Sequence, residues 1–289
     1  MAAGEELCKA IVTGLYGPET KASPDTIRSA ARRLAAPANG PSGQLLARFC
    51  QIFLQAYKNW NYNIEVNGER WLLKQLACFK PAVVFDVGAN VGDWLLSARS
   101  EFPTAQIHAF EIIEATSAEL LKRTAGQTGI VVNQIGLSDL EGTITMRAFE
   151  ASSKLATHTA YPHGKYSELE CPVRRGDDYL RENKIERIDL LKLDVEGAER
   201  QVLGGFAKTL DEGRIDVIQF EYGKVAILTH FLLKDAYDLL EAKGYTVGKL
   251  YPDHVDFRAY KLEDEDFLGP NYVAVRSACT DVVEALSRH

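Results

Sequence analysis

The segment from Val83 to Trp94, which reads VVFDVGANVGDW, constrains the fold of this chain more than any other. Its apolar first half predicts a buried parallel strand, and Gly88 and Gly92 predict a turn with a helix following it. In an open α/β sheet, ligands bind where such strands end and helices begin. The sequence therefore predicts an α/β fold with a ligand site at this turn.

The spacing of the two glycines indicates which ligands the turn does not suit. Loops that bind dinucleotides follow the pattern G-x-G-x-x-G, because their backbone has to approach a pyrophosphate at a helix N-terminus. Here the pattern is G-x-N-x-G, with Asn90 in place of the second glycine. Asp86 adds a carboxylate that would repel an anion. The turn favours a nucleoside ligand that carries a positive charge and no phosphate.

From residue 81 onward, strands and helices are expected to alternate, which is typical of a mostly parallel sheet with helices on both faces. The pattern predicts strands at 83–88, 106–111, 130–136, 188–194, 216–222, 245–250 and 271–276, and helices at 92–101, 114–124, 198–210 and 233–243. A ribbon formed by 143–149 and 170–174 is expected to extend this sheet or to lie at its edge. Residues 150–168 are expected to form a long polar loop.

The first 80 residues have apolar positions at helical spacing, in Leu7-Ile11-Leu15, Ile27-Ala31-Leu34 and Leu45-Phe49-Phe53. Residues 36–43 are rich in Pro and Gly and separate the second of these helices from the third. We therefore divide the chain into an N-terminal helical extension, 1–80, and a domain at 81–289. The extension would pack on the sheet, cover its cleft as a lid or build a homodimer interface, and the sequence leaves all three open.

Charge and cysteine content narrow the class of protein. The chain has 33 Lys and Arg against 40 Asp and Glu, for a net charge of −7, and an acidic surface does not favour nucleic acid or anionic membranes. Its five cysteines form no C-x-x-C pair, which predicts neither a disulfide framework nor a cysteine metal site. No signal peptide or membrane-spanning run is recognisable. We expect a soluble cytoplasmic protein.

Carboxylates recur where the predicted strands end. These residues are Asp86, Glu111, Asp139, Asp194 and Glu221, with Glu196 shortly after the fourth. The ends of parallel strands line one rim, so we expect an acidic cleft, with Glu111 placed to accept ribose hydroxyls. A single such acid is more often a helix cap or a solvated turn residue. The whole set is best explained by a cationic nucleoside cofactor, S-adenosylmethionine.

The segment from Ile188 to Glu199, which reads IDLLKLDVEGAE, is the second strong signal. Alternation along a strand places Lys192, Asp194 and Glu196 on one face. A lysine within such an apolar strand needs a carboxylate partner. Lys192 could pair with Asp194 or Glu221 only to align two strands, or it could act directly in binding or proton transfer.

Taken together, VFDVGANVGDW, IHAFE, GLSDLEG and IDLLKLDVEGAE resemble the FkbM family of S-adenosylmethionine-dependent methyltransferases over roughly residues 81–250. The resemblance implies the class I, Rossmann-like methyltransferase fold and cofactor binding by Asp86, Gly88, Asn90, Gly92 and Glu111. It also implies an adenine contact from Asp139, and it places Asp194 and Glu196 at the junction of cofactor and acceptor. Ile112 departs from the family pattern, where proline is common, and Gly136 stands where alanine is usual.

The resemblance further implies O-methylation of a sugar or another secondary metabolite. In-line methyl transfer requires that the acceptor oxygen be aligned and lose its proton. We rank His230 first as the base, because the segment after the fifth strand should face the acceptor. Asp194, Lys192 and Glu221 complete the catalytic candidates, and further histidines to consider are His158, His163 and His254.

Asp194, Glu196 and Glu221 could alternatively hold a magnesium ion through their oxygens. Lys192 would compete for the same carboxylates, so we predict no metal. Three alternative functions stay open: N-methylation of a small molecule, nicotinamide-dependent oxidation, and a non-catalytic S-adenosylmethionine-binding module. The expected partner is a small-molecule acceptor, whose identity the sequence does not give.

Overall fold

The computed structural model describes residues 9–10, 13, 17, 23–35, 41–149, 156–157 and 166–287. The chain divides into two compact units, Met1–Lys58 and Asn59–His289. The first unit contains the helices α2 (Pro24–Ala35) and α3 (Pro41–Tyr57), whereas the helix expected around Leu7 lies mostly outside the described residues. The role of this unit as a lid or a dimerisation element stays a prediction.

The boundary between the units lies near residue 58 and not near residue 80. Helix α4 (Glu69–Ala77) belongs to the second unit, where Leu72, Leu73 and Leu76 join a core cluster with the first strand of the sheet. The N-terminal helical region is therefore made of two parts, of which the second belongs to the unit that contains the sheet.

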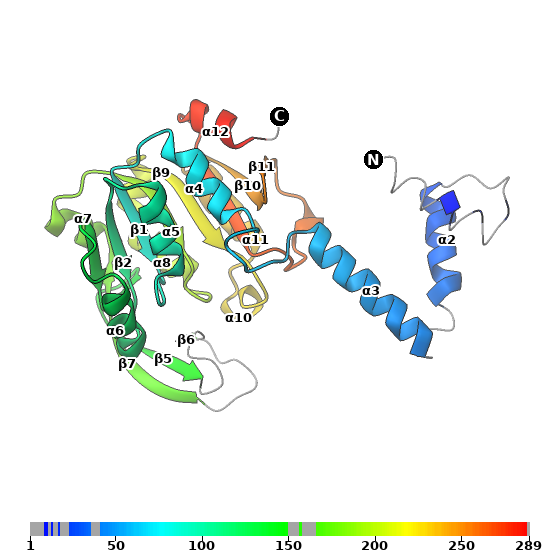
Figure 1. Ribbon diagram of the computed structural model, residues 1–289, viewed down its shortest axis with the longest axis horizontal. Coiled ribbons are helices and arrows are strands. Elements are labelled where there is room, and N and C mark those ends of the chain that lie inside the picture. Colours follow the sequence, from blue (N-terminus) through cyan, green and yellow to red (C-terminus); the bar gives the residue numbers. More distant parts are fainter. Residues whose placement is uncertain are drawn as a thin grey trace. The chain divides into compact units, whose positions relative to one another are not determined.

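The second unit is built on an eight-stranded sheet with the order β11-β10-β12-β9-β8-β1-β2-β3 (Figure 1). The strands are β1 (Val83–Val87), β2 (Gln106–Phe110), β3 (Ile130–Asn133), β8 (Ile188–Leu193), β9 (Ile215–Glu221), β10 (Tyr245–Tyr251), β11 (His254–Phe257) and β12 (Asn271–Arg276). Five neighbouring strands of this sheet, β3, β2, β1, β8 and β9, are parallel to one another. Strand β12 lies between β9 and β10 and is antiparallel to both. The mostly parallel sheet that the sequence predicts is thus confirmed.

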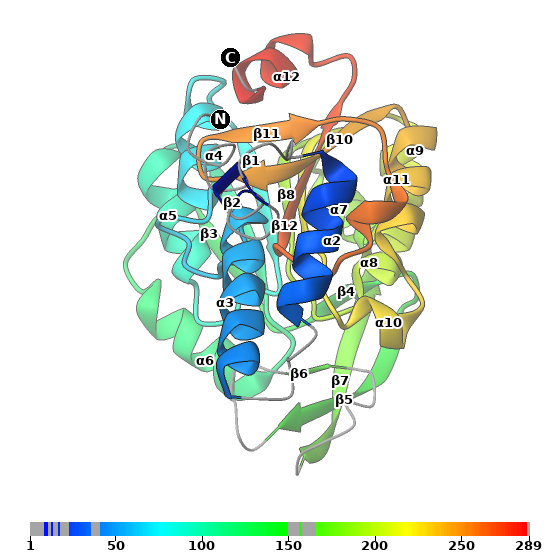
Figure 2. The same ribbon diagram turned by 90° about the vertical axis from the view of Figure 1, so that its right-hand side faces the viewer.

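Helices cover both faces of this sheet (Figure 2). One face carries α4, α5 (Asp93–Glu101), α6 (Glu114–Arg123) and α12 (Thr280–Leu286), and the other carries α7 (Gly176–Asn183), α8 (Glu199–Gly205), α9 (Ala207–Asp211) and α11 (Leu233–Ala242). Successive side chains of a strand point to opposite faces of the sheet. Val84 therefore packs in the core on the α4 side, and its neighbour Phe85 packs in the core on the α8 side. The sheet is therefore buried on both faces, and ligands can reach it only at the strand ends.

The prediction of one strand at 130–136 is wrong. Strand β3 ends at Asn133, whose Nδ2 donates hydrogen bonds to the carbonyl oxygens of Ala109, at 3.1 Å, and Val131. After two intervening residues, β4 (Gly136–Ser138) begins in a second sheet with the order β4-β7-β5-β6, which includes β5 (Gly142–Phe149), β6 (Ala156–Thr157) and β7 (Tyr166–Arg175). The ribbon therefore builds a sheet of its own, and most of the expected polar loop lies outside the described residues.

Other short elements were not predicted. The helix expected at 198–210 is divided into α8 and α9 at Phe206, and α7, α12, β11, α10 (Ala226–Thr229) and the 3₁₀ turn at Leu262–Asp264 are additional. Where the chain is described, its helices are too short or too polar to cross a lipid bilayer.

Candidate active site

The turn after β1 has the backbone conformation that its glycines allow. Gly88 and Gly92 have φ values of 83° and 87°, in the left-handed region that glycine adopts without strain. A Cβ atom on Gly88 would lie 1.8 Å from the carbonyl oxygen of Asp194, so no side chain fits there. Asn90, between them, is also left-handed at 48°, a conformation that asparagine tolerates better than most residues. The turn therefore brings the end of β1 against the end of β8.

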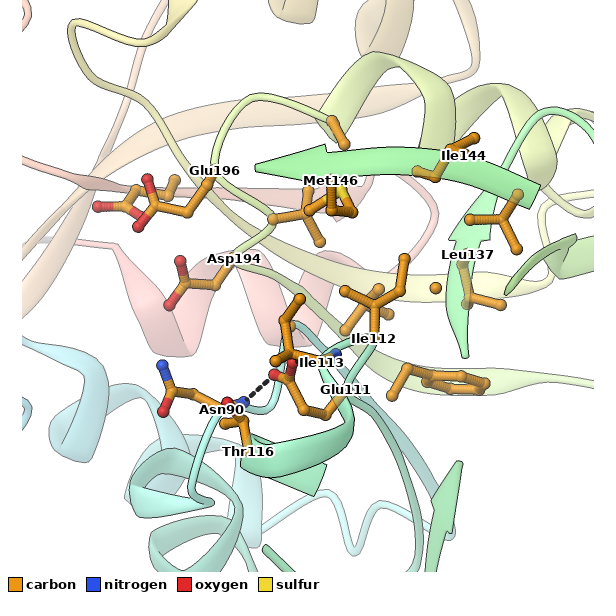
Figure 3. A pocket seen from close by; sticks show the side chains of 18 of the residues that line it. Asn90, Glu111, Ile112, Ile113, Thr116, Leu137, Ile144, Met146, Asp194 and Glu196 are labelled. Carbon is orange, nitrogen blue, oxygen red and sulfur yellow. Dashed lines mark hydrogen bonds between the residues drawn. The ribbon is translucent and has the colours of Figure 1, made fainter. Parts of the chain in front are cut away.

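Glu111 follows β2 and is fixed by this turn. Its two carboxylate oxygens accept hydrogen bonds from the backbone N–H of Asn90, at 2.9 Å (Figure 3), and from that of Ile113, at 2.8 Å. Burial raises the pKa of Glu111, although these backbone hydrogen bonds partly offset the effect. Each oxygen keeps a second lone pair, and the residue lines the cavity described next. Glu111 can therefore accept hydrogen bonds from a ligand without moving.

A cavity of about 260 Å³ lies at these strand ends. Figure 3 shows carboxylates and Asn90 at one end, and at the other end the apolar side chains of Ile112, Leu137, Ile144 and Met146. The apolar end is made partly by β4 and β5, so the second sheet builds a wall of the cavity. We call this space the main cavity. It suits a ligand with a flat apolar part and a hydroxylated part.

The two departures from the family pattern lie against each other in this wall. A Cβ atom on Gly136 would be 2.6 Å from Cδ1 of Ile112, and both residues line the main cavity. The isoleucine side chain thus occupies space that a residue larger than glycine would need. The two substitutions are explained by one packing contact.

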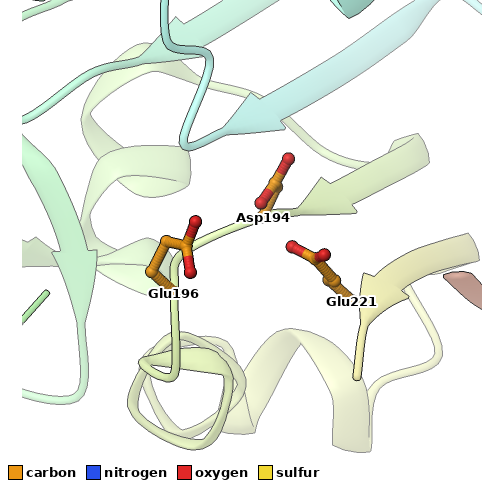
Figure 4. A group of neighbouring side chains, drawn as sticks. All are labelled: Asp194, Glu196 and Glu221. Carbon is orange, nitrogen blue, oxygen red and sulfur yellow. The ribbon is translucent and has the colours of Figure 1, made fainter. Parts of the chain in front are cut away.

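Three carboxylates converge at the polar end of the main cavity. Asp194 follows β8, Glu221 ends β9, and Glu196 stands in the intervening turn with a φ of 50° (Figure 4). One oxygen of each lies within 4.8 Å of the others. We call Asp194, Glu196 and Glu221 the acid triad. Groups of like charge this close cannot all be ionised, so protons are retained within the triad.

Asp194 and Glu221 are hydrogen-bonded to each other and share one proton. Burial and the charge of Asp194 raise the pKa of Glu221 well above its usual range. Burial also raises the pKa of Asp194, but the ammonium group of Lys192 and the hydrogen bond with Glu221 together outweigh burial, so the pKa of Asp194 is lowered. The shared proton therefore resides on Glu221, and Asp194 carries the negative charge.

Glu196 has a different electrostatic setting. Burial, together with the charges of Asp194 and Glu199, raises its pKa to about 7. Glu199, which is buried and accepts a hydrogen bond from the N–H of Gly197, also has its pKa raised to about 7 by burial. Both carboxyl groups thus exchange protons with solvent near neutral pH.

Lys192 contacts the triad through Asp194 and is not among the residues that line the main cavity. Its Nζ is 3.0 Å from Oδ2 of Asp194 and 3.7 Å from Oδ1 of Asp86, the residue beside it in the neighbouring strand. Burial would lower the pKa of Lys192, but the carboxylates of Asp194, Asp86 and Glu69 together raise it. The Lys192–Asp194 contact expected from the sequence is present, and the one with Asp86 is additional.

Asp86 itself is completely buried and is not among the residues that line the main cavity. Burial raises its pKa to about 6 in spite of Lys192. The cofactor contact that the resemblance implies for Asp86 stays a prediction, and in the structure the carboxylate of Asp86 is paired with Lys192.

Several candidates from the sequence lie away from the cavity. His230 is exposed at the end of α10, and His254 lies on β11, with its ring stacked on Tyr251. Asp139 is exposed, accepts a hydrogen bond from the Ser138 hydroxyl and does not line the main cavity, whose wall there is Gly136 and Leu137. The loop histidines at positions 158 and 163 lie outside the described residues. The structure therefore brings no predicted histidine to the triad among the residues it describes.

Sequence reasoning also missed a group of residues beside the triad. A second cavity of about 180 Å³ adjoins the main cavity and shares Tyr62, Glu196 and Glu221 with it. Trp60 and Phe267 line this second cavity as well. They lie in segments without any motif, so only the folded chain places them here.

Comparison with known proteins shows the family to which the chain belongs. Residues 86–247 match the model of the methyltransferase FkbM domain. The chain is 31% identical to the 31-O-demethyl-FK506 methyltransferase FkbM of Streptomyces tacrolimicus, over 63% of this chain and 80% of that protein. It is 28% identical to methyltransferase 1 of Beauveria bassiana, over 62% of this chain and 79% of that protein.

A crystal structure of a methyltransferase FkbM from Methylobacillus flagellatus KT is similar at a TM-score of 0.42 and 16% identity, covering 68% of this chain and 43% of that one. The family and the class I fold that the sequence predicts are confirmed by the domain match and the observed sheet. The chain is a methyltransferase and belongs to the FkbM family.

Proposed function

We propose that this protein transfers a methyl group from S-adenosylmethionine to a hydroxyl group of a small-molecule acceptor. The observation that carries the proposal is the position of the acid triad. Its members line the main cavity, which suits a nucleoside, and two of them, Glu196 and Glu221, also line the second cavity. Membership in a methyltransferase family supports methyl transfer, and the name of the Streptomyces relative supports an oxygen acceptor.

The residues present fit S-adenosylmethionine. Glu111 offers lone pairs at the position for ribose hydroxyls, and the wall of Leu137, Ile144 and Met146 offers apolar surface for adenine. The amino-acid part would lie toward Gly88 and Asn90. Bound there, the cofactor supplies an electrophilic methyl group on a positively charged sulfonium. The surplus of carboxylates at the triad favours that charge, since opposite charges attract strongly at a partly buried site.

Glu196 is the residue that best fits the role of general base. It lines both cavities, and a pKa of about 7 matches the range in which a base works efficiently near neutral pH. Asp194 is a weaker base, because Lys192 stabilises its negative charge, and Glu221 already holds a proton. We therefore propose Glu196, and not His230, as the general base, with Glu221 and Lys192 as positioning residues.

The triad oxygens are close enough to ligate a divalent cation. Lys192 already compensates the charge of Asp194, and we propose a reaction without a metal. N-methylation stays the second candidate, since the same base would serve a protonated amine. Asn90 occupies the place of the glycine that a pyrophosphate needs, which is unfavourable to a nicotinamide cofactor.

Calorimetry with S-adenosylmethionine tests the proposal. The wild type should bind it, Glu111→Ala should lose most of the affinity, and Glu119→Ala, on the exposed surface of α6, should bind like the wild type. Absence of binding by the folded wild-type protein would overturn the proposal. Equal affinity in the two variants would show that Glu111 does not hold the ribose.

A further inference from the structure

We infer that helix α3 is a dimerisation helix, whose apolar face packs against the same face of a second copy of this chain. The helix runs from Pro41 to Tyr57 and lies outside the range 86–247 that matches the methyltransferase domain. Its surface takes no part in the proposed function, so the oligomeric state can be measured without any ligand.

The polar residues of α3 are confined to one narrow stripe. They follow one another at intervals of four, three and four positions and therefore lie on one side of the helix: Gln44, Arg48, Gln51 and Gln55. Arg48 is the only charged residue of this helix. All other positions from Leu45 onward are apolar, which leaves more than half of the helix circumference without polar side chains.

The apolar face of α3 is wide enough for two neighbouring helices. It consists of two parallel rows with the spacing of helices that pack along their length. We call these the first row, Leu45, Phe49, Ile52 and Ala56, and the second row, Leu46, Cys50, Phe53 and Tyr57. A helix on the surface of a domain buries one apolar stripe, whereas a helix in a bundle packs against neighbours on two sides.

The N-terminal unit does not bury this face by itself where it is described. Among its described side chains, Ala30 on α2 is the only apolar one that is buried. Helix α2 offers a single apolar row, at Ile27, Ala30 and Ala31, which leaves one row of α3 without a counterpart on α2. Six large side chains of the two rows are exposed by between 43% and 70%: Leu45, Leu46, Phe49, Ile52, Phe53 and Tyr57.

The exposed area is close to what a stable dimer needs. A large apolar side chain that is about half exposed presents roughly 100 Å², so the six together present roughly 600 Å² on each chain. A standard interface buries about 800 Å² per partner. The largest apolar patch on a typical monomer is only about 300–600 Å². The face of α3 is therefore unfavourable in water and sufficient for one half of an interface.

A second copy of the chain is the partner that this face fits. In a two-fold dimer a surface meets itself, so the row left over on one chain finds its equivalent on the other. Helices that bind membranes carry several Lys or Arg on their polar face, whereas the polar stripe of α3 has only Arg48 among three glutamines. The net charge of −7 is likewise unfavourable to an anionic membrane.

Light scattering after size-exclusion chromatography measures the mass of the full-length protein at micromolar concentration. We expect twice the chain mass of 32.0 kDa for the wild type. Phe49→Glu and Phe53→Glu each place a charge in a row, and each change acts twice in a two-fold interface. We expect either variant to raise the Kd of the dimer by about 30-fold or more and to give monomers. Gln51→Glu is the matched control, because it adds the same charge to the polar stripe of the same helix, and it should stay dimeric.

The reactivity of Cys50 reports on the same face independently. Cys50 lies in the second row and is exposed on the single chain, as is Cys78 of the second unit. A dimer through α3 covers Cys50 and leaves Cys78 accessible. A maleimide should therefore label Cys50 more slowly than Cys78 in the wild type, and at a similar rate in Phe53→Glu. Peptide mass spectrometry locates the label, and circular dichroism shows that each variant is folded.

A monomeric wild type would overturn the inference, and one that sediments with vesicles of phosphatidylcholine and phosphatidylglycerol would assign the face to a membrane instead. A dimer that both row variants leave intact, that Gln51→Glu dissociates as strongly as they do, or that leaves Cys50 as reactive as Cys78 would have its interface elsewhere and would overturn it too. None of these outcomes bears on the proposed function, which is tested by cofactor binding.

Discussion

Lys192 places its ammonium nitrogen 3.0 Å from Oδ2 of Asp194, and this contact sets the protonation of the whole site. Because Asp194 keeps its negative charge, the shared proton stays on Glu221, and Glu196 is left as the member of the acid triad whose pKa is about 7. On its other side Lys192 pairs with buried Asp86 and lies over the ring of Trp94. Lys192 thus stabilises the ionised form of Asp194, which in the proposed mechanism leaves Glu196 as the base.

Replacing Lys192 should therefore lower the free energy of unfolding. Lys192→Met leaves Asp86 and Asp194 without their counter-charge, and breaking a buried ion pair typically destabilises a protein by about 3–5 kcal/mol. Urea unfolding measures the loss. Lys208→Met, which removes a solvent-exposed partner of Glu212, is the control and should cost less than about 1 kcal/mol. Equal stability of the two variants would contradict the account.

The assignment of the base predicts a pH profile. If Glu196 takes the proton, kcat/KM should rise with pH and reach half its maximum near pH 7, where this carboxyl group ionises. Glu196→Gln should lower kcat by about 10²–10⁴-fold and remove this limb of the profile. Glu119→Gln, at an exposed position, should leave both unchanged. A wild-type limb that persists in Glu196→Gln would assign the base elsewhere.

Stability should fall as pH rises from about 4 to 7. Asp86, Glu196, Glu199 and Glu221 have pKa values raised by folding, so between their unfolded and folded pKa values the native state binds more protons than the unfolded state. Buried His108, whose pKa is lowered to about 4, acts in the opposite direction but is a single group.

Thermal unfolding of the ligand-free protein measures this effect. The Tm at pH 5 should exceed that at pH 7.5, and Glu199→Gln should reduce the difference, because glutamine mimics the protonated carboxyl group. A wild-type Tm that is higher at pH 7.5 would contradict the burial of these acids.

The contact between Gly136 and Ile112 predicts a coupled pair of mutations. Gly136→Ala forces a Cβ to within 2.6 Å of Ile112 Cδ1 in the cavity wall, and we expect weaker binding of S-adenosylmethionine and a stability loss of about 1–3 kcal/mol from overpacking. Ile112→Val removes Cδ1, so the double variant should recover most of both. Calorimetry and urea unfolding of the four proteins test this, and strictly additive effects would refute the coupling.

The local features of the site follow from short stretches of sequence. Apolar runs ending in carboxylates predict the parallel strands and the position of Glu111, because a strand, its turn and the next helix are formed by neighbouring residues. The glycine spacing likewise predicts a turn that does not suit a pyrophosphate, and its left-handed residues are found in the structure. The Lys192–Asp194 contact is also local, because the two residues are two positions apart at the end of β8 and their side chains therefore point to the same side.

By itself, the sequence determined the class of fold, the family and the acids at the strand ends. Only the tertiary structure decided that Asp86 is buried beneath the site, that Glu196 has a pKa near 7, and that Trp60 and Phe267 meet beside the triad. The physical reason is that burial and the approach of like charges depend on which segments come together. Trp60 and Phe267 are far apart in the sequence of the second unit, so no local sequence pattern predicts that both line one cavity in the folded chain.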